Sequence, residues 1–548
     1  MNAEGRAFEW LRNAVVGMFV AAILGGFFLP VYTDEVGWRF QERAALDGVD
    51  KLFSDMCGPN TLAAPPFFMM PVRYYSAFFN TSFADPFYVR LSGILYALVW
   101  LALLVVLIRR IAISRPDRMV LTIIGVGLLC LGTMPLLLVW SRPEQPIVLA
   151  ATAALLIAWK QDAGDAAVRT SWARSIGILL LATIALSYHL KAVFLLPLFL
   201  ACLFFASRGR QASLPRLAAG AVMIAMAGWS THYWIHRLQC SGDPILFASF
   251  AQHSLGVELT NARDWTGRIS AMVKIIGNVT LLDYFGMPVP RPNPLSNWLE
   301  PGQIAVGPAF AWFRGLILAW SVAVLLAAIA IYVQLREAWQ NRRLDPRPIL
   351  AALLLGTALA WSATQVIRNV YEAGFVLPLV MLGVVLVLSA PGRGERIGKW
   401  VNVLAAITGL CALASPLAVA TIYAPSFARA KAQTGYLAAQ PYSLAPFGYA
   451  SLEPDIRGAA RKCGIGDPAK AKALMVDDIT YFTFMKSRLP QHYLGVVSIW
   501  KGSIADPMAY LRSKGSDGAI VSCHLLPPGL RARAKSQGQF CCLGPPNW

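Results

Sequence analysis

Long apolar segments separated by short basic connectors occupy the first 423 residues of this 548-residue chain. The first segment runs from about Leu11 to Pro30, which is long enough to cross a bilayer core as a helix. The clearest of those that follow lie at about 91–108, 120–140, 217–234, 313–333 and 401–423. The pattern predicts a polytopic α-helical membrane protein with about eleven transmembrane helices.

Basic residues predict the orientation of these spans. Arg6 and Arg12 precede the first span, and Arg109 and Arg110 end the second. Cytoplasmic connectors are enriched in Lys and Arg, so we expect the N-terminus in the cytoplasm and the C-terminus outside. Residues 1–423 then form a transmembrane domain with two large outer loops, at 31–90 and 235–308.

The last part of the chain, residues 424–548, has a different pattern. Short apolar runs predict strands at 473–478, 493–499, 518–522 and 540–543. Helices are expected between them at 479–487, 507–514 and 528–537. Alternating strands and helices favour an extracytoplasmic α/β domain with a largely parallel sheet.

Composition agrees with a membrane protein and narrows its partners. The chain is 57% apolar and 14% charged, whereas soluble domains carry about 25% charged residues. A net charge of +19 could indicate nucleic-acid binding. The arginines, however, concentrate in the connectors between spans, where they orient the spans and meet anionic lipids. We therefore expect membrane lipids, and no nucleic acid, as partners.

The nine cysteines divide by location. Three lie within apolar spans and are expected to be core residues, namely Cys130, Cys202 and Cys411. The other six are predicted to lie outside the cytoplasm: Cys57, Cys240, Cys463, Cys523, Cys541 and Cys542. An oxidising compartment favours disulfides. We expect two bridges within the last domain, in which Cys463 and Cys523 each pair with one of the adjacent Cys541 and Cys542, and a third between Cys57 and Cys240.

Ionisable residues gather in the predicted outer loops rather than within the spans. They are Asp34, Glu35, Arg142, Glu144, His189, Lys191, Arg368 and Glu372. Transporters usually place polar or broken positions near the middle of the membrane. The arrangement here is instead typical of an enzyme that works at the outer leaflet, and the adjacent pair Asp34 and Glu35 directly follows the first span.

Two short motifs carry a family resemblance: Thr33-Asp34-Glu35 after the first span, and Arg142-Pro143-Glu144 in a tight outer loop. With the many-span core and the outer C-terminal domain, they make the chain resemble the GT-C superfamily of integral-membrane glycosyltransferases. The acidic pair is similar to that of protein O-mannosyltransferases and of aminoarabinose transferases. The Arg-Pro-Glu loop is closer to bacterial arabinofuranosyltransferases.

The resemblance implies a glycosyltransferase of the bacterial inner membrane. Such an enzyme moves a sugar, arabinofuranose being one candidate, from a polyprenyl-phosphate donor to an extracytoplasmic glycan, lipid or protein. An attacking hydroxyl must lose its proton, and Asp34 is the expected base, with Glu35 and Glu144 as further candidate carboxylates. Lys191 and Arg368 are expected to bind the leaving phosphate.

Four more residues are candidates for substrate binding: Arg142, His189, Tyr371 and Glu372. Every candidate also has a structural interpretation; Arg142, for example, could pair with Glu144. A monophosphate carries less charge than a diphosphate, so we expect no metal and no other cofactor.

Two other functions remain open. One is an oligosaccharide ligase that uses a polyprenyl-diphosphate glycan, and the other is a flippase for lipid or sugar that performs no chemistry. In the C-terminal domain, Asp477 and Asp478 follow a predicted strand. That is a usual ligand position in an α/β sheet, but we expect a turn with solvated acids instead.

Overall fold

The computed structural model describes most of the apolar segments and parts of the C-terminal region. The residues it describes are 3–29, 31, 35, 86–141, 144–159, 167–188, 190–207, 215, 217–226, 279, 309–341, 345–364, 373–389, 394–432, 436–437, 440–444, 449–466, 474–477, 479–484, 490–492 and 518–544.

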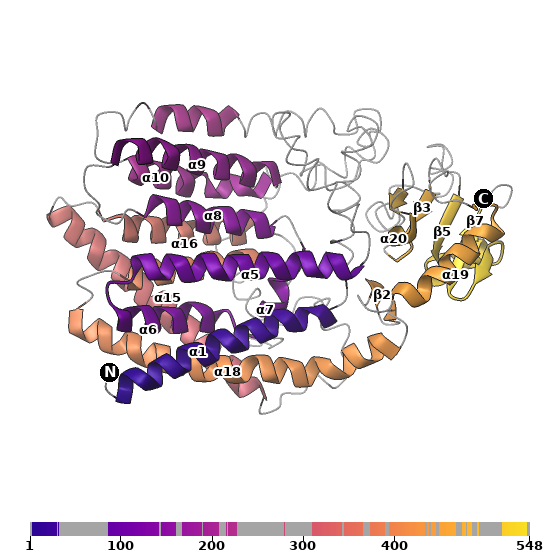
Figure 1. The fold of residues 1–548 in the computed structure, drawn as a ribbon, viewed down its shortest axis with the longest axis horizontal. Helices are drawn as coiled ribbons and strands as arrows, with labels where there is room; N and C mark the ends of the chain where they lie inside the picture. The colour runs from indigo at the N-terminus through magenta and orange to yellow at the C-terminus, as the bar shows by residue number, and fades with distance from the viewer. Residues whose placement is uncertain are drawn as a thin grey trace.

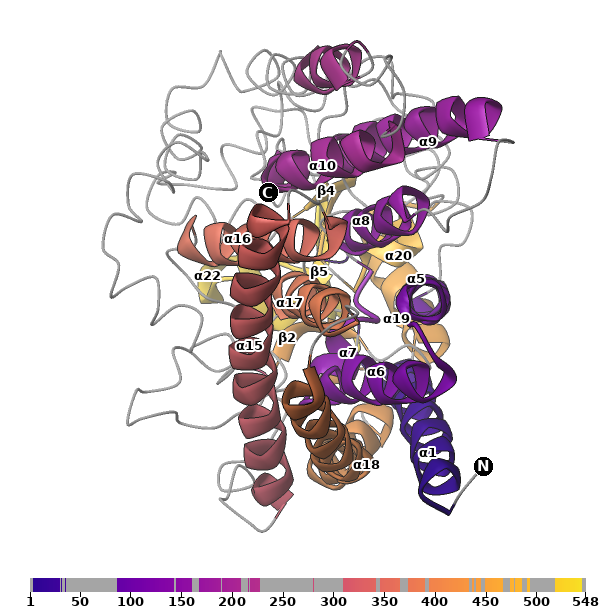
Figure 2. The ribbon, with the colours of Figure 1, turned by 90° about the vertical axis from the view of Figure 1, so that its left-hand side faces the viewer.

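Helices packed side by side form a bundle, and a small sheet lies beyond one end of it (Figure 1). Figure 2 looks along the bundle, so that α5 and α17 are seen nearly end-on. The main helices are α1 (Ala3–Gly25), α5 (Pro86–Ile111), α6 (Arg115–Leu128), α8 (Glu144–Ala158), α9 (Ala167–Tyr188), α10 (Leu196–Ser207), α15 (Ala309–Gln340), α16 (Pro346–Thr364), α17 (Ala373–Leu388) and α18 (Gly394–Ala432). Short helical turns accompany them: η1 (Gly26–Phe28), α7 (Met134–Leu137) and η4 (Leu190–Leu195).

Four helical stretches among the described residues are long and apolar enough to cross a membrane. They are Gly5–Phe28, Pro86–Ile111, Arg314–Gln340 and Gly398–Thr421. Shorter apolar helices occupy Glu144–Ala158, Trp172–Leu186, Ala192–Ala206, Leu217–Met226 and Ala373–Leu388. The predicted class, an apolar helical bundle followed by a small α/β domain, is confirmed, while the count of eleven crossings stays a prediction.

The third predicted span, 120–140, is not one helix. Helix α6 ends at Leu128, a turn containing Gly132 at φ 52° follows, and α7 resumes for one turn. The predicted continuous helix is therefore wrong at this point. Because residues 129–133 are mostly apolar, hydropathy alone does not reveal the break.

Side chains from other segments satisfy the backbone groups that this break releases. Trp320 Nε1 donates to the Leu128 carbonyl at 2.8 Å, and the Ser415 hydroxyl donates to the Cys130 carbonyl at 2.6 Å. The Thr133 amide donates to the Val279 carbonyl at 3.0 Å. Irregular backbone at membrane depth is tolerated where protein groups bond to it in this way.

Helix α18 joins the bundle to the C-terminal domain. Its 39 residues give a length of about 58 Å, at about 1.5 Å per residue, well beyond a hydrocarbon core of about 30 Å. The helix thus continues past the predicted span 401–423 and leads to the hairpin of β1 (Tyr436–Leu437) and β2 (Gln440–Leu444) (Figure 1).

The C-terminal domain contains a five-stranded sheet in the order β4-β3-β5-β7-β6. The strands are β3 (Leu474–Val476), β4 (Pro490–His492), β5 (Gly518–Ser522), β6 (Lys535–Gln537) and β7 (Phe540–Leu543). Strand β3 is parallel to β4 and β5, whereas β7 is antiparallel to β5 and β6. The α/β class is confirmed, but the sheet is mixed rather than largely parallel.

Two helices predicted in this domain have described counterparts. Within 479–487 the structure describes α20 (Tyr481–Phe484), and residues 485–487 lie outside the described residues. The helix expected at 528–537 ends as α22 (Pro528–Arg531). The rest of the second prediction is wrong, because Lys535–Gln537 is strand β6, which turns into β7 through Gly538 at φ 54°. No apolar side chain marks β6. The strand and helix predicted at 493–499 and 507–514 lie outside the described residues.

Helix α19 (Tyr449–Lys462) precedes the sheet and ends in a Schellman motif. Gly464 has a φ of 80°, its amide donates to the Arg461 carbonyl, and the Ile465 amide donates to the Ala460 carbonyl. This motif satisfies carbonyls at the helix end and reverses the chain.

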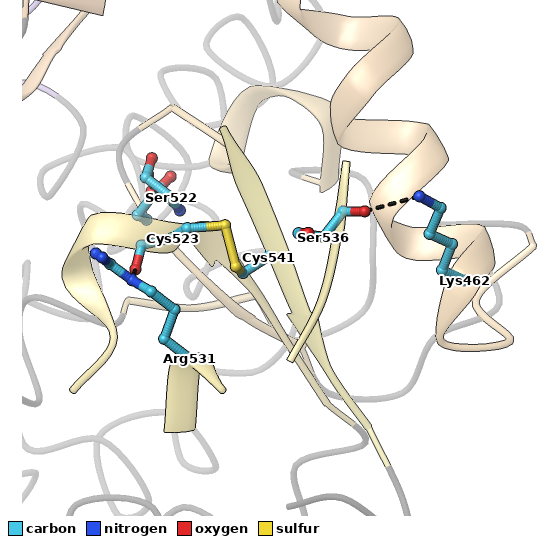
Figure 3. The surroundings of a disulfide bond; sticks show 7 residues. Lys462, Ser522, Cys523, Arg531, Ser536 and Cys541 are labelled. Carbon is cyan, nitrogen blue, oxygen red and sulfur yellow. Dashed lines mark hydrogen bonds between the residues drawn. A yellow bond between two sulfur atoms is a disulfide. The ribbon is translucent and has the colours of Figure 1, made fainter. Parts of the chain in front are cut away.

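Two disulfides hold the domain together, as predicted. Cys463 after α19 bonds to Cys542 in β7, and Cys523 after β5 bonds to Cys541. Figure 3 shows the second bond, with Arg531 Nε donating to the Cys523 carbonyl and Lys462 donating to the Ser536 carbonyl. Cys130, Cys202 and Cys411 are buried free thiols, also as predicted. Cys57 and Cys240 lie outside the described residues.

Candidate functional site

A buried ion pair at one end of the bundle holds Glu35, the last residue of the acidic motif. Glu35 and Arg90 are both fully buried. Arg90 Nη2 lies 2.7 Å from Glu35 Oε2, and Nη1 lies 3.1 Å from Oε1. Both terminal nitrogens of the guanidinium thus donate to the carboxylate. A bidentate contact of this kind fixes orientation as well as charge.

The same pair ties together three segments that are distant in sequence. Arg90 comes from the first turn of α5, and it also donates to the carbonyls of Leu29 and Val139, both at 3.1 Å. The Ser141 amide donates to Glu35 Oε1 at 2.8 Å. The end of the first span, the start of the second and the loop before α8 therefore form one junction, which we call the latch: Leu29, Glu35, Arg90, Val139 and Ser141.

Glycines permit the close approach of these segments. A Cβ atom on Gly93 of α5 would overlap the Val139 carbonyl, and one on Gly26 would overlap the Val139 side chain. Gln145 at the start of α8 donates to the Leu138 carbonyl. The loop is thereby fixed on both sides of Val139, and the contacts leave no room for a larger residue at Gly93.

Glu144 lies at the start of α8, three residues beyond the latch. It is buried and stands in the first helical turn, where the helix dipole favours a negative charge. A pocket beside it is mostly apolar and rich in aromatic rings. Its lining residues are Tyr96, Ala97, Trp100, Leu137, Leu138, Trp140, Glu144, Gln145, Val148, Leu149 and Gly374. A carboxylate next to aromatic side chains offers partners to both the polar edges and the apolar faces of a sugar ring.

The structure describes none of the side chains of the other predicted site residues. Lys191 falls within η4, for which the structure describes the backbone but not this side chain. The remainder lie outside the described residues: Asp34, Arg142, His189, Arg368, Tyr371 and Glu372. Their roles stay predictions.

Arg90 is the residue that sequence reasoning missed. The second span was predicted to start at Leu91, which placed Arg90 in the outer loop without a role. A charged residue at the border of an apolar span is itself a signal, because such residues are usually paired or functional. Its partner, 55 positions away, has no sequence signature.

A third buried carboxylate, Asp477, lies at the carboxyl end of β3. It accepts hydrogen bonds from the amides of Ile479 and Thr480 and from both the amide and hydroxyl of Ser522, at 2.6 to 3.0 Å. The expectation of a solvated acid is wrong for Asp477, since this residue is 1% exposed. Asp478 lies outside the described residues. Asp477 thus acts as a structural acceptor rather than a ligand site.

His524 follows this network on the surface of the domain. Burial of part of the ring lowers the pKa of the His524 imidazole; the Asp477 carboxylate opposes this change, and the charge of Arg531 adds to it. In the part of the chain that the structure describes, no group of three metal-binding side chains occurs.

Similarity to known proteins is found among solved structures. No protein-family model matches the chain, and no curated protein matches it. Among solved structures, it is similar to ArnT from Cupriavidus metallidurans, crystallised with bound undecaprenyl phosphate. The match covers 96% of this chain and 97% of that one, with 13% identity and a TM-score of 0.44. An identity and a TM-score this low do not by themselves assign a function to the chain.

Proposed function

We propose that the protein is a membrane glycosyltransferase that transfers a sugar from a polyprenyl-phosphate donor to an acceptor outside the cytoplasm. The observation that carries the proposal is the latch, because it fixes Glu35, the residue directly after Asp34, against the loop before Glu144. An enzyme that positions a base needs a rigid frame around it. The motif resemblance to GT-C glycosyltransferases supplies the reaction class.

In the proposed mechanism, Asp34 accepts the proton of the acceptor hydroxyl as its oxygen attacks the anomeric carbon. The bond between that carbon and the phosphate oxygen breaks, and the polyprenyl phosphate leaves with both bonding electrons. Lys191 and Arg368 stabilise the departing phosphate by charge. Direct displacement with a single base and no covalent intermediate inverts the configuration of the sugar.

Glu35 has a different part in this proposal. Both of its oxygens accept from Arg90, and one also accepts from Ser141. A carboxylate held in this way is a poor candidate for proton transfer, so we assign it to the frame. Glu144, Arg142, His189, Tyr371 and Glu372 are proposed to bind the sugar or the acceptor.

The latch also bears on the rival functions. A flippase must change conformation around its substrate, whereas the latch closes three segments on one another through a buried ion pair. A ligase that acts on a polyprenyl diphosphate would have more phosphate charge to neutralise than a monophosphate enzyme. We propose a metal-independent reaction, located in the bacterial inner membrane, with the N-terminus inside and the C-terminus outside.

The test uses purified protein in lipid nanodiscs with polyprenyl-phosphate arabinofuranose carrying a radiolabel as the first donor probe. Wild type should transfer label to a cell-envelope extract, with or without EDTA. Asp34→Asn should lower turnover by at least about 10²-fold, the usual scale for a general base. Glu453→Gln removes a surface carboxylate of the C-terminal domain and is the matched control.

Other outcomes would redirect the proposal. Normal activity in Asp34→Asn, together with loss of activity in Glu144→Gln, would show that the wrong carboxylate was chosen. Transfer of a whole glycan, detected by the mass added to the acceptor, would identify a ligase. Movement of labelled lipid across the membrane with no product under any donor would identify a flippase.

A further inference from the structure

The buried apolar residues of the described chain form two separate clusters. The larger lies within the helical bundle and extends from Val15 to Val419. The smaller belongs to the C-terminal domain, with members such as Tyr449, Ile456, Phe484 and Ile520. Two valines from the bundle belong to the smaller cluster instead of the larger: Val31 and Val89, each 1% exposed.

These two valines stand next to the latch in sequence. Val31 lies between Leu29, whose carbonyl binds Arg90, and Glu35, whose carboxylate binds Arg90. Val89 directly precedes Arg90 in the first turn of α5. Successive residues on a helix point about 100° apart, so one turn of α5 presents Arg90 to the latch and Val89 to the domain. In Figure 1, this end of α5 reaches toward the C-terminal domain.

The domain that receives the valines is covalently braced. Cys542 of β7 is a member of the same apolar cluster, and it is bonded to Cys463 at the end of α19. The neighbouring Cys541 is bonded to Cys523 at the end of β5. Val31 and Val89 thus pack into a core whose central strands and flanking helix are cross-linked.

We propose that the C-terminal domain is a positioning element of the active site, and that it acts through Val31 and Val89. By enclosing both valines, the domain holds Val31 and the first turn of α5 in place, so that Glu35 and Arg90 meet in one geometry. The proposal rests on the proposed function, in which Asp34, the residue before Glu35 in the sequence, is the base. In this proposal the buried valines act through the latch, so they are positioning residues rather than catalytic ones.

The experiment compares two double variants that make the same chemical change in the two cores. Val31→Ala with Val89→Ala removes the contact with the domain. Val15→Ala with Val126→Ala removes equivalent groups from fully buried positions of the bundle. A third protein, Val31→Thr with Val89→Thr, keeps the volume but buries hydroxyls, and serves if the alanine variant does not fold.

We expect the Val31/Val89 alanine variant to lose about tenfold or more in kcat, with the KM for the donor changed less than twofold. The threonine variant should show the same split. The conservative Val31→Ile with Val89→Ile should retain most of the activity. Equal kcat losses in the Val31/Val89 and Val15/Val126 variants would overturn the proposal, because the effect would then be one of general stability.

A second readout does not depend on transferase activity. Hydrogen exchange at the amides of residues 90–93, the first in α5 that bond to carbonyls of its opening turn, should accelerate in the Val31/Val89 variants and stay at the wild-type rate in the Val15/Val126 variant. Unchanged exchange there would overturn the positioning role. If wild type transfers no sugar while exchange responds as expected, the proposed function fails and the docking of the domain onto the latch stands.

Discussion

Glu35 and Asp477 are both buried carboxylates, but their negative charges are balanced in different ways. Glu35, at one end of the bundle, is paired with the guanidinium of Arg90 at 2.7 Å. Asp477 in the C-terminal domain is surrounded by neutral donors, namely the amides of Ile479, Thr480 and Ser522 and the Ser522 hydroxyl. One carboxylate is balanced by an opposite charge, and the other by oriented dipoles.

The partners also differ in sequence separation, which shows how much of the fold must form before each hydrogen-bond network can form. Glu35 binds residues 55 and 106 positions away, so its hydrogen bonds require that three segments of the bundle have already assembled. Asp477 binds residues two and three positions away, together with Ser522 on the adjacent strand. The first network therefore depends on bundle assembly, whereas the second depends on one turn and one strand pair.

The largest expected effect follows from removing the charge partner of Glu35. Arg90→Met leaves a buried carboxylate without compensation, which typically costs about 3–5 kcal/mol. We expect most of the protein to be aggregated or degraded, as measured by size-exclusion chromatography of detergent extracts. Arg457→Met is the control, because Arg457 pairs with Glu453 at an exposed position, where such pairs contribute at most about 1 kcal/mol.

Removing both charges tests whether the cost of Arg90→Met comes from the uncompensated charge of Glu35. Glu35→Met combined with Arg90→Met should recover much of the folded protein, since replacing a buried ion pair by apolar groups is often neutral for stability. If Arg90→Met alone behaves like Arg457→Met, Arg90 does not compensate a buried charge on Glu35. Glu35 and Asp477 would then not differ in how their charges are balanced.

The second effect is smaller and confined to the C-terminal domain. In Asp477→Asn, the side-chain NH₂ must face amides that are themselves donors, in either orientation of the group. Loss of such buried hydrogen bonds costs about 1–3 kcal/mol. Hydrogen exchange should become faster in β3 and β5, while α5 and α17 keep their wild-type protection. Faster exchange throughout the bundle would contradict the local character of this network.

The sequence was most informative where one physical rule dominates. Apolar length gave the helices of the bundle, because a segment that must satisfy its backbone groups in lipid has to be helical. Four cysteines within the last 86 residues, two of them adjacent, led to the correct prediction of both bridges in the C-terminal domain. Strands β3, β5 and β7 coincide with compact apolar runs.

The features that were missed depend on tertiary contacts. The break after Leu128 is stabilised by Trp320 and Ser415, which are distant in sequence. Strand β6 is polar and is paired because β7 provides a partner. The sequence indicates Glu35 as a candidate site residue, but its partner Arg90 could not be chosen among the arginines of the chain without the fold.

A third prediction separates the frame from the chemistry. Glu35→Gln keeps the shape of the side chain but loses its charge, so Arg90 keeps one acceptor oxygen at this position and loses the ion pair. We expect turnover to fall about tenfold, or about 1.4 kcal/mol, which is less than the loss in Asp34→Asn. The pH dependence of turnover should keep the wild-type shape. If its acidic limb disappears instead, Glu35 takes part in proton transfer and is not only part of the frame.

The smallest expected effect is that of the Asp477 charge on the pKa of a neighbouring group. The charge of Asp477 is balanced by dipoles and still acts on His524, opposing the burial and the Arg531 charge that lower the pKa of this imidazole. Because the folded pKa is below the usual value of about 6.5, the unfolded chain binds more protons between those two values. The stability of the domain should therefore decrease as the pH falls through that window.

His524 is largely exposed, so solvent screens these interactions and the change in stability should be smaller than in any variant above. The measurement is an NMR titration of ¹³C-labelled histidine in the full chain, with His524→Gln used to assign the signal among the six histidines. The pKa of His524 should lie below its usual value in wild type and fall further in Asp477→Asn, where the opposing negative charge is gone. Glu35→Gln should leave the titration unchanged. An unchanged His524 pKa in Asp477→Asn would mean that the dipoles around Asp477 screen its charge as completely as Arg90 compensates that of Glu35.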